Sequence, residues 1–137
     1  MNAPEHLSHK PIIAVNDYDK IDAIYANDTD VRALSIGQAQ YDEDELSLKI
    51  WRHTSEKWSR QSEEMPIHRA LDLSILAVAA ILTDTSSKYP MTSLREEIMI
   101  ESRVGEIHQY YEDHKHMLKP RLEELRKILN TFFERNI

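Results

Sequence analysis

The sequence predicts an α+β fold, in which a three- or four-stranded antiparallel sheet packs on a central buried helix, with C-terminal helices alongside. Two observations predict it. From residue 46 to residue 51, Leu or Ile alternates with Ser, Lys or Trp, which is the period of a strand with one buried face. Residues 73–82 are apolar except for Ser74, and a helix that is apolar nearly all round is buried on more than one side. We expect a single domain over residues 1–137.

Strand-like patterns recur four times, separated by turn-forming residues. They cover residues 11–15, 31–41, 45–53 and 57–62. The first suits the edge of a sheet, because proline is tolerated at the start of an edge strand. Gly37, inside the second, predicts a bulge or a close backbone approach. Residues 1–9 are polar and are expected to be flexible.

The polar run 54–57 predicts a tight hairpin between the third and fourth strands. This turn would place His53 opposite Trp58 and Trp51 opposite Arg60. The Arg60 guanidinium would then lie against the Trp51 ring in a cation–π contact.

Helix signals follow the hairpin. Pro66 suits the first position of a helix over residues 66–83, because its missing N–H would be unpaired there in any case. Ser93 and Glu96 have the spacing of a capping box and predict the start of the next helix. Pro120 should kink or divide the C-terminal helical segment. The last helix has an apolar face made of Leu122, Leu125, Ile128, Leu129, Phe132 and Phe133.

Composition excludes several classes of function. The formal net charge is −7, and non-specific binding to nucleic acid depends on Lys and Arg meeting phosphate, so we expect no nucleic-acid partner. The absence of cysteine excludes disulfides and thiolate chemistry and fits a reducing cytoplasm. The start of the chain lacks the pattern of a signal peptide. No apolar run approaches the roughly 20 residues that a membrane span needs. The expected location is the cytoplasm, without membrane attachment.

The run KIWRHTSEKWSRQSEEMPIHRALDL, residues 49–73, resembles the central motif of a family of small bacterial proteins known only as a domain of unknown function. The resemblance extends over residues 7–83, and the acidic helical segment 95–116 departs from it. The resemblance implies a bacterial source, and it supports the view that residues 46–82 form one structural unit. Because the family has no assigned activity, the resemblance implies no catalytic residue.

Charged side chains gather at the expected corner between the hairpin and the start of the helix. These residues are Arg52, His53, Arg60, Glu63, Glu64, His68, Arg69 and Asp72. On a helix, Glu64 and Asp72 would lie one turn on either side of His68 and prepare its ring for proton transfer. Guanidinium groups suit a phosphate or carboxylate ligand. The candidate ligand-binding residues are therefore Arg52, His53, Arg60, Glu64, His68 and Arg69. The alternative is a structural ion-pair network that fixes the hairpin to the helix.

Other histidines and acids favour no metal or cofactor site. His108, Glu112 and His116 share a helical face, but the outer two are about 12 Å apart along a straight helix, so the three cannot bind one ion. His114 lies on an apolar stripe and reads as a core or interface residue. The acidic run 42–45 reads as a solvated turn, with a cation site as the alternative. With two glycines in the chain, a Gly-rich phosphate loop is excluded.

Two functions of different class fit these patterns, and neither assigns a catalytic residue. The first is a non-enzymatic domain that binds a partner protein, as an accessory or immunity factor does, or that pairs with a second copy through the C-terminal helix as a homodimer. The second is a small anion-binding domain or enzyme that acts through the arginines and histidines of the corner. The second requires a cleft of roughly 300 Å³ or more lined by those side chains.

Overall fold

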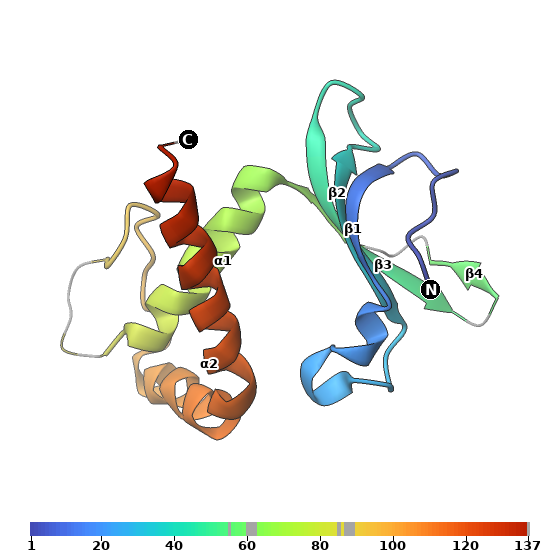
Figure 1. The fold of residues 1–137 in the computed structure, drawn as a ribbon. Coiled ribbons are helices and arrows are strands. Elements are labelled where there is room, and N and C mark those ends of the chain that lie inside the picture. Colours follow the sequence, from blue (N-terminus) through green and yellow to red (C-terminus); the bar gives the residue numbers. More distant parts are fainter. Residues whose placement is uncertain (55, 60–62, 85, 87–89, 137) are drawn as a thin grey trace. The chain divides into compact units, whose positions relative to one another are not determined.

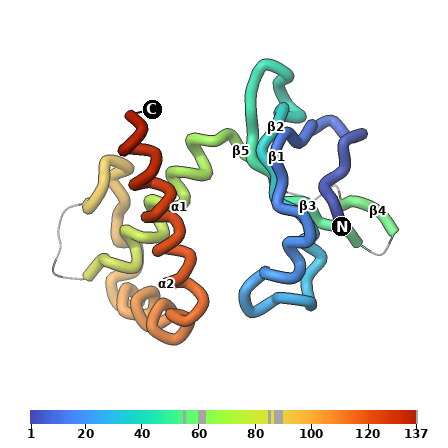
Figure 2. Tube along the Cα trace, in the orientation of Figure 1, coloured from blue at the N-terminus to red at the C-terminus, as the bar shows by residue number. Residues whose placement is uncertain are grey.

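The computed structural model describes residues 1–54, 56–59, 63–84, 86 and 90–136. The chain forms two compact units, residues 1–74 and residues 75–137. The first contains an antiparallel sheet, and helices make up most of the second, so the fold is α+β as predicted (Figures 1 and 2). The single domain over the whole chain stays a prediction, and each unit is described by itself.

The sheet follows the order of the chain. Its strands are β1 (Lys10–Asn16), β2 (Val31–Gln38), β3 (Leu46–Thr54), β4 (Lys57–Trp58) and β5 (Glu64–Pro66). The order is β1-β2-β3-β4, and β5 also pairs with β3. All pairs are antiparallel, and β1 is the edge strand that the sequence predicts. Two 3₁₀ turns, Tyr18–Lys20 and Ala23–Tyr25, connect β1 to β2.

Gly37 lies where two strands approach closely, as predicted. It pairs with Pro11, and the register of β1 against β2 shifts between Pro11 and Ile13, which is a bulge in β1. A Cβ atom on Gly37 would stand 1.9 Å from the carbonyl oxygen of Lys10. No side chain fits at this distance, so glycine is required by space rather than by its backbone angles.

The most buried face of the sheet carries polar as well as apolar residues. Ala33, Ser35, Ser47 and Trp51 are buried, whereas Leu46 is exposed. Strand β3 therefore has one strongly buried face, as predicted, but that face carries Ser47 and Trp51. The alternation of Leu and Ile in β3 indicated the opposite face. Segment 1–9 contributes two buried residues to the unit, Pro4 and His9.

The helices are α1 (Ile67–Leu82), a 3₁₀ turn (Glu101–Arg103) and α2 (Val104–Glu134). Pro66 is the last residue of β5, one position before the helix begins. Ala79 is the buried residue of α1, and burial of this helix at the centre of the fold stays a prediction. Among the helices that the structure describes, none combines the length and apolarity needed to cross a bilayer.

The segment before α2 differs from its prediction. Ser93 and Glu96 do not open a helix, because Glu96 instead accepts hydrogen bonds from the backbone N–H and hydroxyl of Thr92. The helix begins at Val104. It continues through Pro120, and its direction changes between its first and second halves, as a kink at proline predicts (Figure 1).

Candidate functional site

The predicted corner contains an ion-pair network around Arg52. The Arg52 guanidinium donates to Asp30 Oδ1 at 2.7 Å and to Glu63 Oε1 at 2.9 Å. Hydrogen bonds from Arg52 lower the pKa of the Glu63 carboxyl. Two carboxylates therefore already neutralise this arginine, which is the arrangement expected of a structural network.

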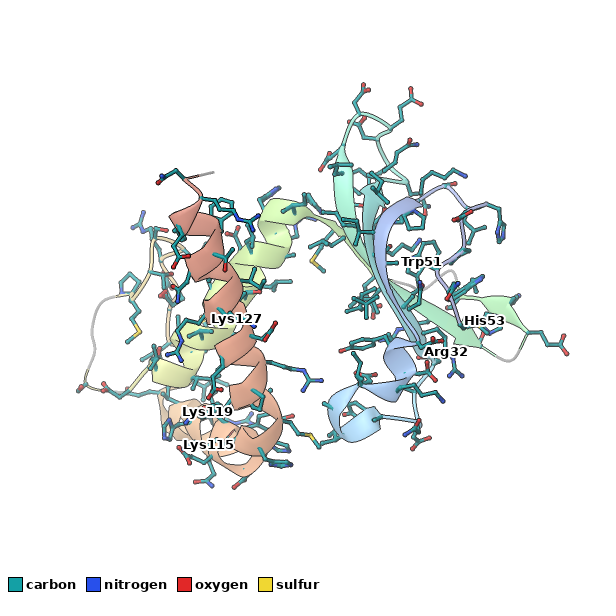
Figure 3. All side chains as sticks on the ribbon, in the orientation of Figure 1. Arg32, Trp51, His53, Lys115, Lys119 and Lys127 are labelled. Atoms are coloured by element: carbon teal, nitrogen blue, oxygen red, sulfur yellow. The ribbon has the colours of Figure 1, made fainter. Side chains whose placement is uncertain are left out.

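Aromatic rings form a row beside this network. His53 pairs with Trp58 across the hairpin, as predicted, and their rings meet edge to face with centroids 5.0 Å apart. Trp58 contacts Trp51, and Trp51 contacts His9, each with centroids 5.6 Å apart. Figure 3 labels Trp51 and His53 on β3. The predicted contact between Arg60 and Trp51 lies outside the described residues. The cation that the structure places over the Trp51 ring is Lys49, 4.2 Å from its centroid.

Glu64 and His68 do not have the helical relation that the sequence predicts. Glu64 belongs to β5, and the first turn of α1 presents His68 and Arg69 as exposed side chains. The Glu64 carboxylate instead accepts hydrogen bonds from the Ser47 hydroxyl at 2.7 Å and the Gln40 backbone N–H at 3.0 Å. The prediction is wrong because the chain is still extended at residue 64. Ligand binding by the corner residues stays a prediction.

A buried polar network centred on His9 was missed at the sequence level. His9 is fully buried. Its Nδ1 lies 2.9 Å from Glu64 Oε1 and 3.0 Å from Ser47 Oγ, and its Nε2 lies 2.9 Å from Ser35 Oγ. The Trp51 indole N–H donates to the same Ser35 oxygen at 2.8 Å. The network ties segment 1–9 to β2, β3 and β5.

Each hydrogen-bond donor of this network has an acceptor when His9 is neutral. Nδ1–H then donates to Glu64 and Ser47, the Ser47 hydroxyl donates to Glu64, and the Ser35 hydroxyl donates to Nε2. A second ring proton would take the lone pair to which Ser35 donates and leave that hydroxyl without an acceptor in the network. Burial lowers the pKa of His9, against the opposing effect of Glu64. Burial also raises the pKa of Glu64, but hydrogen bonds from Ser47, Gln40 and His9 outweigh it and lower that pKa overall.

Ser35, His9 and Glu64 stand in the order of a nucleophile, a base and an acid. The arrangement is nevertheless a structural one. Ser35 is only 4% exposed, and its oxygen is occupied by the Trp51 N–H. A serine that attacks a substrate must be reached by that substrate. We therefore assign the network to stability.

Replacing Ser35 by alanine should destabilise the sheet unit by about 1–3 kcal/mol, because it leaves the Trp51 indole N–H and His9 Nε2 buried without a partner. Urea unfolding followed by tryptophan fluorescence measures this, since both tryptophans lie in residues 1–74. Ser74→Ala is the matched control, because that hydroxyl is exposed and donates to the Ala70 carbonyl oxygen of the same helix. Equal stability of Ser35→Ala and wild type would contradict the assignment.

The described residues line two sizeable hollows, one in each unit. A mostly apolar one of about 710 Å³, in residues 75–137, has walls that include Leu76, Met91, Ile98, Ile100, Val104 and Ile107. A polar one of about 520 Å³ adjoins the acidic turn 42–45 in the sheet unit. Neither is lined by a corner residue that the structure describes. The cleft that an anion-binding function requires is not one of these two.

Two of the three histidines of α2, His108 and His114, have local partners. His108 Nε2 lies 3.5 Å from Glu112 Oε1, and the His114 ring stacks on Tyr110 with centroids 4.0 Å apart. The two rings of the second pair are on one face of the helix, one turn apart. Among the residues that the structure describes, no three His, Asp or Glu side chains are grouped to hold a metal ion.

The second half of α2 exposes a cluster of large apolar side chains. All are more than a third exposed: Leu125, Ile128, Leu129, Phe132 and Phe133. Such side chains gathered along one helix mark a contact surface more often than scattered ones do. This is the apolar face that the sequence predicts for the last helix.

Comparison with known proteins places the chain among proteins without an assigned activity. A family model described as "Family of unknown function (DUF6530)" matches residues 1–106. No curated protein and no solved structure matches the chain. The predicted resemblance to a family of unknown function is confirmed. The match extends beyond residues 7–83 and ends before the exposed half of α2.

Proposed function

Because this chain belongs to the DUF6530 family, whose function is unknown, we propose a function from its geometry: a non-enzymatic domain that binds a partner protein. The partner is bound by the second half of α2. The observation that carries the proposal is the group of five exposed apolar side chains between Leu125 and Phe133. Burying apolar area of this kind is the main source of free energy in protein association.

The polar groups of the sheet unit support binding over catalysis. Ser35, His9 and Glu64 stand in the order of a catalytic triad, but Ser35 and His9 are buried and the three are hydrogen-bonded through His9. Arg52, one of the residues predicted to bind an anion, is held by two carboxylates. An anion bound at Arg52 would have to displace both of them, so the anion-binding alternative has less support there.

Photo-crosslinking in the cells that produce the protein tests the proposal. A benzophenone amino acid at Phe133, which is 68% exposed, should give a covalent adduct with one defined protein. The same group at Glu134 should give little adduct, since residues 133 and 134 lie about 100° apart around the helix. The partner identified should then bind the purified chain, and Leu129→Asp should weaken that binding by about tenfold or more.

The alternative is tested by thermal shift with phosphorylated and carboxylated metabolites. Stabilisation that is lost in Arg69→Ala, an exposed position, would favour the anion-binding function. The proposal would be overturned if no crosslinked protein bound the purified chain and if a metabolite gave stabilisation that Arg69→Ala removes.

A further inference from the structure

The apolar face of α2 has the spacing of a coiled-coil seam. Leu118, Leu122, Leu125, Leu129 and Phe132 follow one another at steps of four, three, four and three. This is the alternation of the two inward positions of a heptad, which places their side chains along one line of the helix. Leu118 and Leu122 are half-buried, whereas Leu125, Leu129 and Phe132 are more than a third exposed. The seam thus becomes more exposed towards the end of the helix.

Basic residues flank the seam on both sides. At 100° per residue, Lys119 and Arg126 lie beside it on one side and Arg121 on the other. In heptad terms these are the positions that face the charges of a partner helix. Lys119 and Arg126 have no ion pair within the described chain. Figure 3 labels Lys119 and, further along α2, Lys127.

Acidic residues lie on the back of the same helix. Glu123, Glu124 and Glu134 point away from the seam, and Lys127 lies among them. Apart from Lys127, the charges are therefore sorted by side, with bases next to the apolar line and acids opposite it. This occurs in a chain whose net charge is −7, so the basic flanks do not follow from overall composition.

We propose that the partner of α2 is an acidic amphipathic helix, with apolar residues on its own seam and Glu or Asp beside them. This inference rests on the proposed function and names the class of partner. Complementary charges at flanking positions select which helices pair and penalise pairs with like charges.

Charge complementarity favours an acidic helix over two other possible partners of the seam, which are a second copy of α2 and an anionic membrane surface. A second copy of α2 would bring basic flanks against basic flanks, which is repulsive in either orientation. An anionic membrane surface selects helices whose polar face is rich in Lys and Arg, whereas the polar face of α2 carries Glu123, Glu124 and Glu134. Both therefore fit the seam less well than an acidic helix does.

Two synthetic peptides of three heptads test the inference on the full chain. Both have Leu at the seam positions, one with Glu and the other with Lys at the flanking positions. In fluorescence anisotropy, the chain should bind the Glu peptide and not the Lys peptide. The triple variant Lys119→Glu, Arg121→Glu, Arg126→Glu should weaken binding of the Glu peptide by about tenfold or more and gain binding of the Lys peptide. Lys127→Glu, the same charge change on the back of the helix, should alter affinity less than about twofold.

Circular dichroism of each variant shows whether α2 is intact. Equal affinity for both peptides, or no binding of the Glu peptide up to about 100 µM (roughly −5.5 kcal/mol), would overturn the inference. The inference would also be overturned if the chain formed a homodimer that Leu129→Asp dissociates, or if anionic phospholipid vesicles displaced the Glu peptide. If crosslinking at Phe133 identifies a partner without an acidic helix, the proposed function stands and this inference fails.

Discussion

Gly37→Ala is expected to destabilise the sheet unit by about 3 kcal/mol or more. The added Cβ would stand 1.9 Å from the Lys10 carbonyl oxygen, which is backbone and cannot swing aside as a side chain does. The strands β1 and β2 must separate locally, and overpacking that shifts backbone lies at the upper end of the typical range of about 1–3 kcal/mol or beyond it. Urea unfolding monitored by the fluorescence of Trp51 and Trp58 measures the loss.

The other glycine of the chain is the matched control. A Cβ on Gly105 would meet no atom within 4 Å, and the position lies in the first turn of α2. Gly105→Ala should therefore stabilise the helix, by up to about 1 kcal/mol, as alanine does in helices. Its effect is read by the helical circular dichroism signal. A Gly37→Ala variant as stable as wild type would show that β1 and β2 are further apart than described.

Acid should destabilise the sheet unit in two steps, the first of which belongs to His9. The folded pKa of His9 lies below its ordinary value of 6.5, so the unfolded chain takes up this proton first. The stability is fully present above pH 6.5 and falls as pH decreases below it, by at most about 1.4 kcal/mol per pH unit. The pKa of Glu64 is also lowered, from 4.5, so a second loss follows below pH 4.5. Tryptophan-detected urea unfolding at a series of pH values measures both.

Two variants assign the steps. His9→Gln keeps a hydrogen-bond donor and acceptor but cannot titrate, so its unfolding free energy should be lower and nearly constant between pH 7 and 5.5. Glu64→Gln should remove most of the dependence below pH 4.5. If the slope between pH 7 and 5.5 persists in His9→Gln, another group is responsible for it.

Local patterns predicted the elements well, because their signals lie in neighbouring residues. Gly37 inside a strand indicated a close approach, and the short polar run after Thr54 indicated the pairing of His53 with Trp58. The bounds of an element are harder to predict where one residue suits both of two neighbouring elements. Pro66 suits both the end of an edge strand and the start of a helix, and the strand takes it.

The buried network could not be predicted from local patterns. Ser35 and Ser47 alternate with apolar residues and therefore look solvent-facing by the period of two. Their burial depends on His9, which is 26 and 38 residues away in the chain. A histidine in a polar N-terminal segment carries no signal that it enters a core. Arg52 and Glu63 were recognised as part of a charged cluster, but only the structure shows Asp30 as their third member.

The bulge in β1 has a consequence for self-association of the protein. An edge strand with exposed isoleucines, here Ile12 at 69% and Ile13 at 70%, would template the addition of foreign strands and lead to aggregation. Pro11 cannot donate a hydrogen bond to an added strand, Lys10 brings a charge, and the shifted register bends the edge out of line. Addition of a foreign strand at this edge is thereby resisted, so the exposed isoleucines of β1 can stay in contact with water without promoting aggregation.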